Sequence, residues 1–178
     1  QEKLYNLYTG KYDSPNFQQG TPPYLDAGGN IAIDPADGLP IVSRTENLRF
    51  ALTVPKGETP PEGWPIILYA HGTGGSYKSF VNDGSATAAA EVKAANGDVI
   101  ERFAMVSIDQ VLHGPREPSD FDTNLAFFNL FNLNAVLDNP KQGAADDFQL
   151  LRMVTGLDIT APTTNQRLKF NLDHIYFK

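Results

Sequence analysis

Two histidine–glycine pairs are the residues of this sequence that could most readily do chemistry. The first opens the run His71-Gly72-Thr73-Gly74-Gly75, and the second is His113-Gly114. The three glycines of the first run allow positive φ and let the backbone approach a ligand closely. Backbone N–H groups held in this way can stabilise the negative oxygen that develops during acyl transfer. A plain glycine-rich turn is the alternative, and the run by itself favours that alternative.

The other histidines have simpler explanations than proton transfer. His113 lies where it could line a substrate pocket, but a loop-bracing histidine paired with Arg116 or Asp109 is the interpretation we favour. His174 lies inside an apolar run near the end of the sequence, which favours a core or sheet-surface position.

An acidic stretch has to be considered as a calcium site. Asp120, Asp122 and Asn124 have the alternating oxygen-ligand spacing that opens an EF-hand loop. Leu125 and Phe131 stand where that loop needs its glycine and its bidentate glutamate, so we predict a solvated acidic loop and no metal site.

An aromatic and apolar cluster follows, spaced by asparagines. It could cover an acyl-binding pocket or form core beneath a loop, and a dense apolar run is more often packing. The cluster comprises Phe127, Phe128, Leu130, Phe131 and Leu133.

Three apolar runs predict the strands that position the loops. Residues 64–70, 103–108 and, less purely, 172–177 are short and continuous, as expected of strands buried on both faces of a parallel sheet. Residues 48–54 alternate between apolar and polar, which predicts a half-buried antiparallel edge strand. Residues 1–47 show no period and predict an extended lead-in with little regular structure.

Two helices are expected between these strands. Residues 85–95 are rich in alanine, and residues 139–154 have Asn139 as N-cap, Pro140 at the first position, Gln142 closing a capping box and Gly156 as the stop. In the second helix Phe148, Leu151 and Val154 should share one face. The order strand, helix, strand, helix, strand predicts an α/β fold: a mostly parallel sheet with flanking helices. Ligands of such sheets bind beyond the carboxyl ends of the strands, where both histidine–glycine pairs lie.

Composition excludes several classes of function. The chain has 178 residues, a net charge of −7 and scattered basic residues, which argues against nucleic-acid binding. It contains no cysteine, so disulfides, thiolate catalysis and cysteine-ligated zinc are excluded. No apolar run approaches the length needed to span a bilayer.

From residue 48 to residue 178 the sequence resembles the N-terminal half of an α/β-hydrolase, with the large bacterial extracellular esterases and lipases as the nearest likeness. The motifs that carry the resemblance are residues 71–75, Ser107-Ile108-Asp109 and His113-Gly114-Pro115-Arg116.

The resemblance implies hydrolysis of a small-molecule or lipid carboxylic ester through a serine acyl-enzyme. It implies no cofactor and a secreted or cell-envelope location. The Thr73 N–H, with Gly74 as the neighbouring candidate, would bind the oxyanion, while His71 would brace the loop and Gly75 and His113 would adjoin the substrate.

The nucleophile of such an enzyme is missing from the sequence. No Gly-x-Ser-x-Gly is present, although in the family it would follow the strand at residues 172–177. We therefore expect the serine, acid and histidine on a companion segment or second chain beyond residue 178. We also expect the 178 residues alone to be unstable or to aggregate. A non-catalytic α/β binding module, and a peptidase or acyltransferase on the same fold, remain as alternatives.

Overall fold

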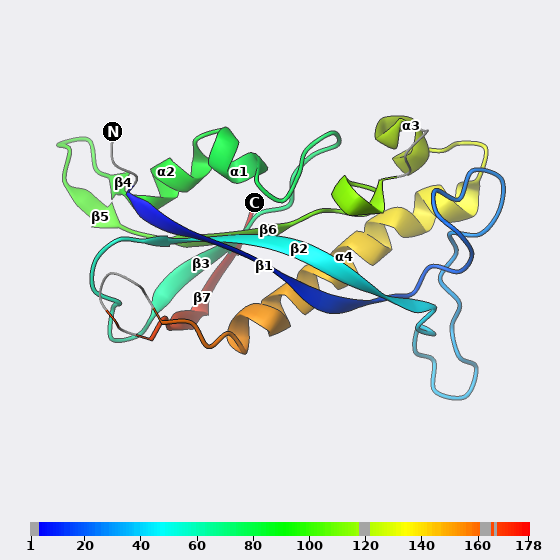
Figure 1. Ribbon diagram of the computed structural model, residues 1–178, viewed down its shortest axis with the longest axis horizontal. Helices are drawn as coiled ribbons and strands as arrows, with labels where there is room; N and C mark the ends of the chain where they lie inside the picture. The colour runs from blue at the N-terminus through cyan, green and yellow to red at the C-terminus, as the bar shows by residue number, and fades with distance from the viewer. Residues whose placement is uncertain (1–3, 118–121, 161–164, 166) are drawn as a thin grey trace.

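The structure is a computed structural model that describes residues 4–117, 122–160, 165 and 167–178. The described residues form a five-stranded mixed sheet, a two-stranded sheet and four α-helices (Figure 1). This confirms the α/β class, although the large sheet is only partly parallel. Its strands are β1 (Tyr5–Asn16), β2 (Arg44–Pro55), β3 (Trp64–Leu68), β6 (Ala104–Ile108) and β7 (Phe170–Phe177). The helices are α1 (Ser79–Asn82), α2 (Ser85–Ala90), α3 (Thr123–Phe127) and α4 (Leu133–Thr155), with a 3-10 turn η1 (Gly114–Arg116).

The order of the strands places a crevice at the end of β3. The sheet runs β1-β2-β6-β3-β7, with β1, β2 and β6 antiparallel in turn and β6, β3 and β7 parallel. From β3 the chain goes to β6 on one side and then returns to β7 on the other side. Ligands of open α/β sheets bind at such a reversal, beyond the carboxyl ends of the strands.

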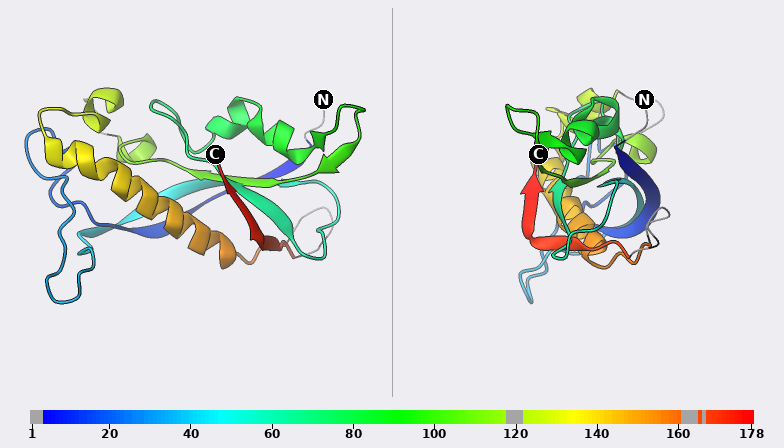
Figure 2. Two further views of the ribbon diagram at one scale, coloured as in Figure 1. Left: turned by 180° about the vertical axis from the view of Figure 1, so that it is seen from behind. Right: turned by 90° about the vertical axis from the view of Figure 1, so that its left-hand side faces the viewer.

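Helices cover both faces of the sheet, as Figures 1 and 2 show. On one face Phe80 of α1 and the alanines of α2 pack against Ala51 and Met105. On the other face Leu150 and Val154 of α4 pack against the apolar side chains of β2, β3 and β6. Successive residues of β2 therefore point alternately into the two cores on opposite faces of the sheet, which explains the period of two in its sequence.

The prediction of little regular structure in residues 1–47 is wrong for residues 5–16. These residues form β1, which pairs with β2 along its whole length from Tyr5↔Pro55 to Asn16↔Arg44. As a result β2 lies between β1 and β6 and is not the edge strand that its alternation predicts.

The long helix begins earlier than predicted. Asn132 is its N-cap and its side chain accepts the Ala135 N–H, so Asn139 and Pro140 lie inside α4. The Asn139 amide is buried and contacts other segments, accepting from Gln18 Nε2 and donating to the Phe127 carbonyl. The helix ends before Gly156, as predicted.

The alanine-rich helix is shorter than predicted. Only residues 85–90 are helical, and the chain then forms a small hairpin of β4 (Val92–Lys93) and β5 (Val99–Glu101). Gly97 has a φ of +90° in the turn of this hairpin, a conformation that an alanine run alone does not reveal.

Large apolar side chains are exposed at the start of α4 and along its outer face. Of the aromatic cluster, Phe127 is half-buried, while Phe131 is 96% exposed, so the cluster is not core. Phe148 is 72% exposed, and only Val154 of the predicted apolar face is fully buried. The exposed set comprises Phe128, Leu130, Phe131, Leu133, Leu137 and Phe148.

Replacing Phe131 by serine should therefore change the free energy of unfolding by less than about 0.5 kcal/mol, because the ring is already in solvent. The same variant should bind less of the dye ANS than the unaltered chain. Phe80→Ala is the matched control, since Phe80 is fully buried and its loss should cost about 3–5 kcal/mol. Urea unfolding measures both, and an equal cost for the two variants would contradict the exposed position of Phe131.

Within the residues that the structure describes, no helix is both long and apolar enough to cross a membrane.

Candidate active site

A cavity of about 370 Å³ opens at the carboxyl ends of β3, β6 and β7. It lies where the strand order reverses, with α4 forming its far wall. Its walls combine apolar side chains with a few polar groups, which is usual for a small-molecule site. The lining residues are Ala70, His71, Gly72, Thr73, Gln110, His113, Phe127, Asn139, Pro140, Gly143, Ala144, Asp147 and Phe177.

His113 joins two loops through both of its ring nitrogens. Its Nε2 accepts the Gly74 N–H at 3.0 Å, and its Nδ1 lies 2.8 Å from the Val111 carbonyl oxygen. A ring that accepts at Nε2 can donate from Nδ1, so the same tautomer satisfies both contacts. Arg116 and Asp109, the partners expected from the sequence, are not those of this ring, because two backbone groups take its nitrogens.

His71 is held in the same way from the opposite side. Its Nε2 accepts the Gln110 N–H at 3.0 Å, and its Nδ1 lies 2.8 Å from the Gly72 carbonyl oxygen. The two imidazoles meet edge to face with ring centroids 4.8 Å apart. Both buried rings are fully engaged by backbone groups, so neither is placed to take a proton from a nucleophile.

The two candidate oxyanion donors of the loop differ in whether a protein group accepts their N–H. The Gly74 N–H is donated to His113 and the Gly75 N–H to the Gly72 carbonyl. Within the described part of the chain, the Thr73 N–H has no acceptor, and Thr73 lines the cavity. Of the two candidate oxyanion donors, Thr73 is therefore the one still available.

Two glycines of the loop have separate reasons to be glycine. Gly74 has a φ of +78°, which side chains disfavour. A Cβ on Gly75 would lie 2.8 Å from His71 Nδ1, so this residue permits close packing against the imidazole. Gly75 is not among the residues that line the cavity, whereas His113 is.

Asp109 and Arg116 belong to a buried polar network behind the cavity. Asp109 binds Arg49 at 2.6 Å. Arg116 binds Glu46 at 2.8 Å and Asp146 at 2.7 Å.

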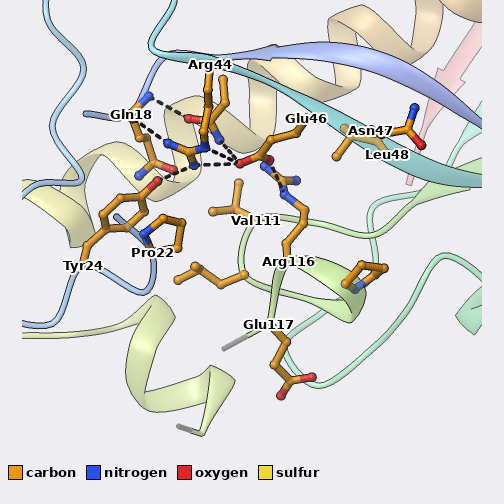
Figure 3. Close-up of a pocket in the computed structure, with 13 residues that line it drawn as sticks. Gln18, Pro22, Tyr24, Arg44, Glu46, Asn47, Leu48, Val111, Arg116 and Glu117 are labelled. Carbon is orange, nitrogen blue, oxygen red and sulfur yellow. Dashed lines mark hydrogen bonds and ion pairs between the residues drawn. The ribbon is translucent and has the colours of Figure 1, made fainter. Parts of the chain in front are cut away.

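Glu46 and Arg116 of this network also line a second cavity of about 410 Å³, shown in Figure 3. There Arg44 binds Glu46 at 2.7 Å and the Tyr24 hydroxyl at 2.6 Å, and it donates to the Gln18 carbonyl. Because both of its arginines are occupied by protein groups, we assign this cavity to the docking of residues 16–24 onto the sheet.

Asp147 is a polar wall residue that sequence reasoning missed. It projects from α4, and its Oδ1 accepts the Gln110 side-chain amide at 3.2 Å. Burial, which disfavours the ionised form, raises the pKa of Asp147 to about 6. The sequence gives no signal for this position, because an aspartate pair on an amphipathic helix usually faces solvent.

The acidic stretch does not form a metal site where it is described. Asp122 is the N-cap of α3, and its side chain accepts the N–H groups of Asn124 and Leu125. Asp120 lies outside the described residues. No group of metal-ligating side chains is found among the residues that are described. His174 lies exposed on β7, which places it at the sheet surface.

Burial lowers the pKa of His71, with the neighbouring His113 acting in the same direction and the Gly72 carbonyl and Asp109 opposing it. The unfolded chain then binds more protons than the folded chain below pH 6.5, so this contribution to stability is full above pH 6.5 and is lost as the pH falls. Burial of Asp147 acts in the opposite sense, because its raised pKa lets the folded state bind more protons below pH 6.

We expect His71→Leu to lower the free energy of unfolding by about 1–2 kcal/mol at pH 8, since leucine has no acceptor for the Gln110 N–H. The difference from the unaltered protein should shrink as the pH falls from 6.5 toward 5. Urea unfolding of both proteins at each pH measures this difference in the free energy of unfolding. Asp147 is present in both proteins, so its contribution cancels in the difference. A difference that grows on acidification would contradict a neutral, buried His71.

The chain was compared with protein-family models, with curated proteins and with solved structures. No match is found in any of the three comparisons.

Proposed function

We propose that this chain supplies the oxyanion-binding half of a serine hydrolase that acts on carboxylic esters. The observation that carries the proposal is the loop 71–75, which two buried histidines fix at the cavity, while the Thr73 N–H has no acceptor among the residues that the structure describes. This loop joins β3 to α1, and α/β-hydrolases place one oxyanion donor in the loop between the third strand and the first helix.

The proposed reaction assigns a limited role to these residues. A serine attacks the ester carbonyl, and the carbonyl oxygen becomes an oxyanion in the tetrahedral intermediate. The Thr73 N–H donates to that oxygen, and the N–H after the serine supplies the second donor. The serine, its histidine and the acid come from sequence or a second chain beyond these 178 residues, so this chain contributes electrostatic stabilisation and part of the pocket.

The cavity walls suit the apolar part of an ester. Phe127, Phe177 and Pro140 line it together with two alanines, and no charged side chain besides Asp147 does so within the described residues. An acyl or alcohol group without charge would bury apolar surface there. A small-molecule or lipid ester therefore fits better than an anionic substrate, and a secreted or cell-envelope enzyme is part of the same proposal.

The test is to treat the natural protein that contains these residues with a fluorophosphonate and to locate the adduct by mass spectrometry. We expect one phosphonylated serine in a Gly-x-Ser-x-Gly motif, together with hydrolysis of p-nitrophenyl esters that the reagent abolishes. Absence of both the adduct and the hydrolysis would overturn the proposal.

A non-catalytic binding module is the second candidate. It is favoured by one observation: within the described residues, the cavity lining contains neither serine nor cysteine. Binding of an ester analogue without turnover would support it. Turnover of amides, or transfer of the acyl group to an added alcohol, would instead indicate a peptidase or acyltransferase with the same oxyanion device.

A further inference from the structure

Gln110 connects helix α4 to the loop that carries Thr73. Its backbone N–H donates to His71 Nε2 at 3.0 Å, and its side-chain Nε2 donates to Asp147 Oδ1 at 3.2 Å. His71 in turn contacts the Gly72 carbonyl oxygen at 2.8 Å. An unbroken path of hydrogen bonds therefore runs from Asp147 to the residue before Thr73.

The Gln110 side chain packs against α4 between Gly143 and Asp147. Its Oε1 would lie 3.4 Å from a Cβ placed on Gly143, one turn before Asp147, so the amide lies close to the helix backbone there. The amide therefore lies over α4 beside Gly143 and donates to Asp147.

Asp147 differs from the neighbouring Asp146 in its partners. Asp146 is buried and binds Arg116 at 2.7 Å. Within the described part of the chain, the only hydrogen-bond partner of the Asp147 side chain is Gln110, and no cation lies within ion-pair distance. Asp147 lines the candidate active-site cavity and also the apolar groove between α4 and β7. Burial disfavours the ionised form of Asp147, so stability does not explain this carboxylate, and its contact with Gln110 is the role that the structure shows.

We propose that Asp147 is a positioning residue that holds the loop 71–75 through Gln110 and His71, and so fixes the direction of the Thr73 N–H. The inference rests on the proposed function for its consequence in catalysis, but the coupling itself is a property of the fold. A charged acceptor makes a stronger hydrogen bond than a neutral one, so the ionised carboxylate holds Gln110 most firmly.

The coupling should therefore depend on pH near the pKa of Asp147, which is about 6. The titratable groups that surround Asp147 are His71 and His113 across the cavity, Tyr176 on β7, Tyr12 on β1 and Asp146 on α4. A variant in which only residue 147 can no longer titrate separates the effect of Asp147 on Gln110 from the effects of the two histidines.

The experiment compares Asp147→Asn and Asp147→Ala in the natural protein, with NMR of the Gln110 side-chain amide and of the His71 ring nitrogens as readout. In the unaltered protein the Gln110 amide signals should shift with a midpoint near pH 6. Asp147→Asn, which keeps an acceptor but cannot titrate, should lose that shift. At pH 8, Asp147→Ala should speed hydrogen exchange of the Gln110 backbone N–H about tenfold, and Asp147→Asn by less than about threefold.

Gln110→Ala provides the second route, because it cuts the same path and keeps the backbone N–H. The double variant with Asp147→Ala should exchange no faster than Gln110→Ala alone. The proposal would be overturned if Asp147→Ala changed neither the exchange rate of the Gln110 N–H nor the His71 ring signals. It would also be overturned if the effects of the two substitutions on the exchange rate were additive in the double variant. These readouts need no substrate, so an intact coupling in a protein without esterase activity would reject the proposed function and leave this inference standing.

Discussion

Replacing Thr73 by proline should lower kcat for ester hydrolysis by about 10²–10³-fold, with a small change in KM. Proline has no N–H, and of the two candidate oxyanion donors only the Thr73 N–H has no acceptor within the described residues. The oxyanion forms after substrate binds, so loss of the donor should affect the chemical step. Steady-state kinetics of the natural protein with p-nitrophenyl esters measures the effect.

Thr73→Ser and Thr73→Ala are the matched controls, because both keep the N–H. They should retain kcat within about threefold of the unaltered enzyme, since the side chain is not the proposed donor. Unchanged circular dichroism of Thr73→Pro would show that the fold persists. Equal kinetics for the proline and alanine variants would remove Thr73 from the oxyanion site.

A large effect on stability is expected for Arg116→Met. The Arg116 side chain is 9% exposed and lies between Asp146, which is 1% exposed, and Glu46. Methionine would leave two carboxylates largely buried without their shared cation. The free energy of unfolding should fall by about 3–5 kcal/mol, as for other buried ion pairs that lose one partner.

Arg167→Met is the control for this prediction. Arg167 also binds an aspartate, Asp158, at 2.9 Å, but both side chains are about 70% exposed. The loss of such a surface pair should cost less than about 1 kcal/mol. Urea unfolding at pH 7 compares the two variants, and a similar cost for both would contradict the structural role assigned to the network in Figure 3.

The central strands could be predicted from sequence because both of their faces are buried. Residues 64–70 and 103–108 are continuous apolar runs for that reason, and they form β3 and β6. The first strand could not be predicted in the same way. Tyr8 and Tyr12 supply its apolar contacts on one face. A Cβ on Gly10 between them would lie 2.7 Å from the ring of Phe50, so a glycine interrupts the alternation there.

The start of α4 shows a different limit. Asn139-Pro140 is a sound signal for a helix N-terminus, but Asn132 already caps the helix, and the Asn139 amide binds Gln18 and Phe127 instead. Tertiary contacts override the local signal there.

The position of the candidate site could be predicted from the sequence, but the hydrogen bonds that hold it could not. Residue types located the glycine-rich run and both histidines, whereas the partners of the rings are backbone groups on neighbouring loops. Because almost every residue has the same backbone N–H and carbonyl groups, the sequence does not reveal backbone partners. The side chains of Arg116 and Asp109 were therefore the expected partners of His113. The role of Asp147 depends on the distance between α4 and β6, which only the fold sets.

The measurement that tests the account most directly is a crystal structure of the natural protein after reaction with a fluorophosphonate. The phosphonyl oxygen of the adduct occupies the place of the oxyanion. We expect this oxygen at about 2.7–3.1 Å from the Thr73 backbone nitrogen, with both histidine rings still bound to the Gly74 and Gln110 N–H groups. A phosphonyl oxygen bound elsewhere, with the Thr73 N–H facing away from it, would contradict the account.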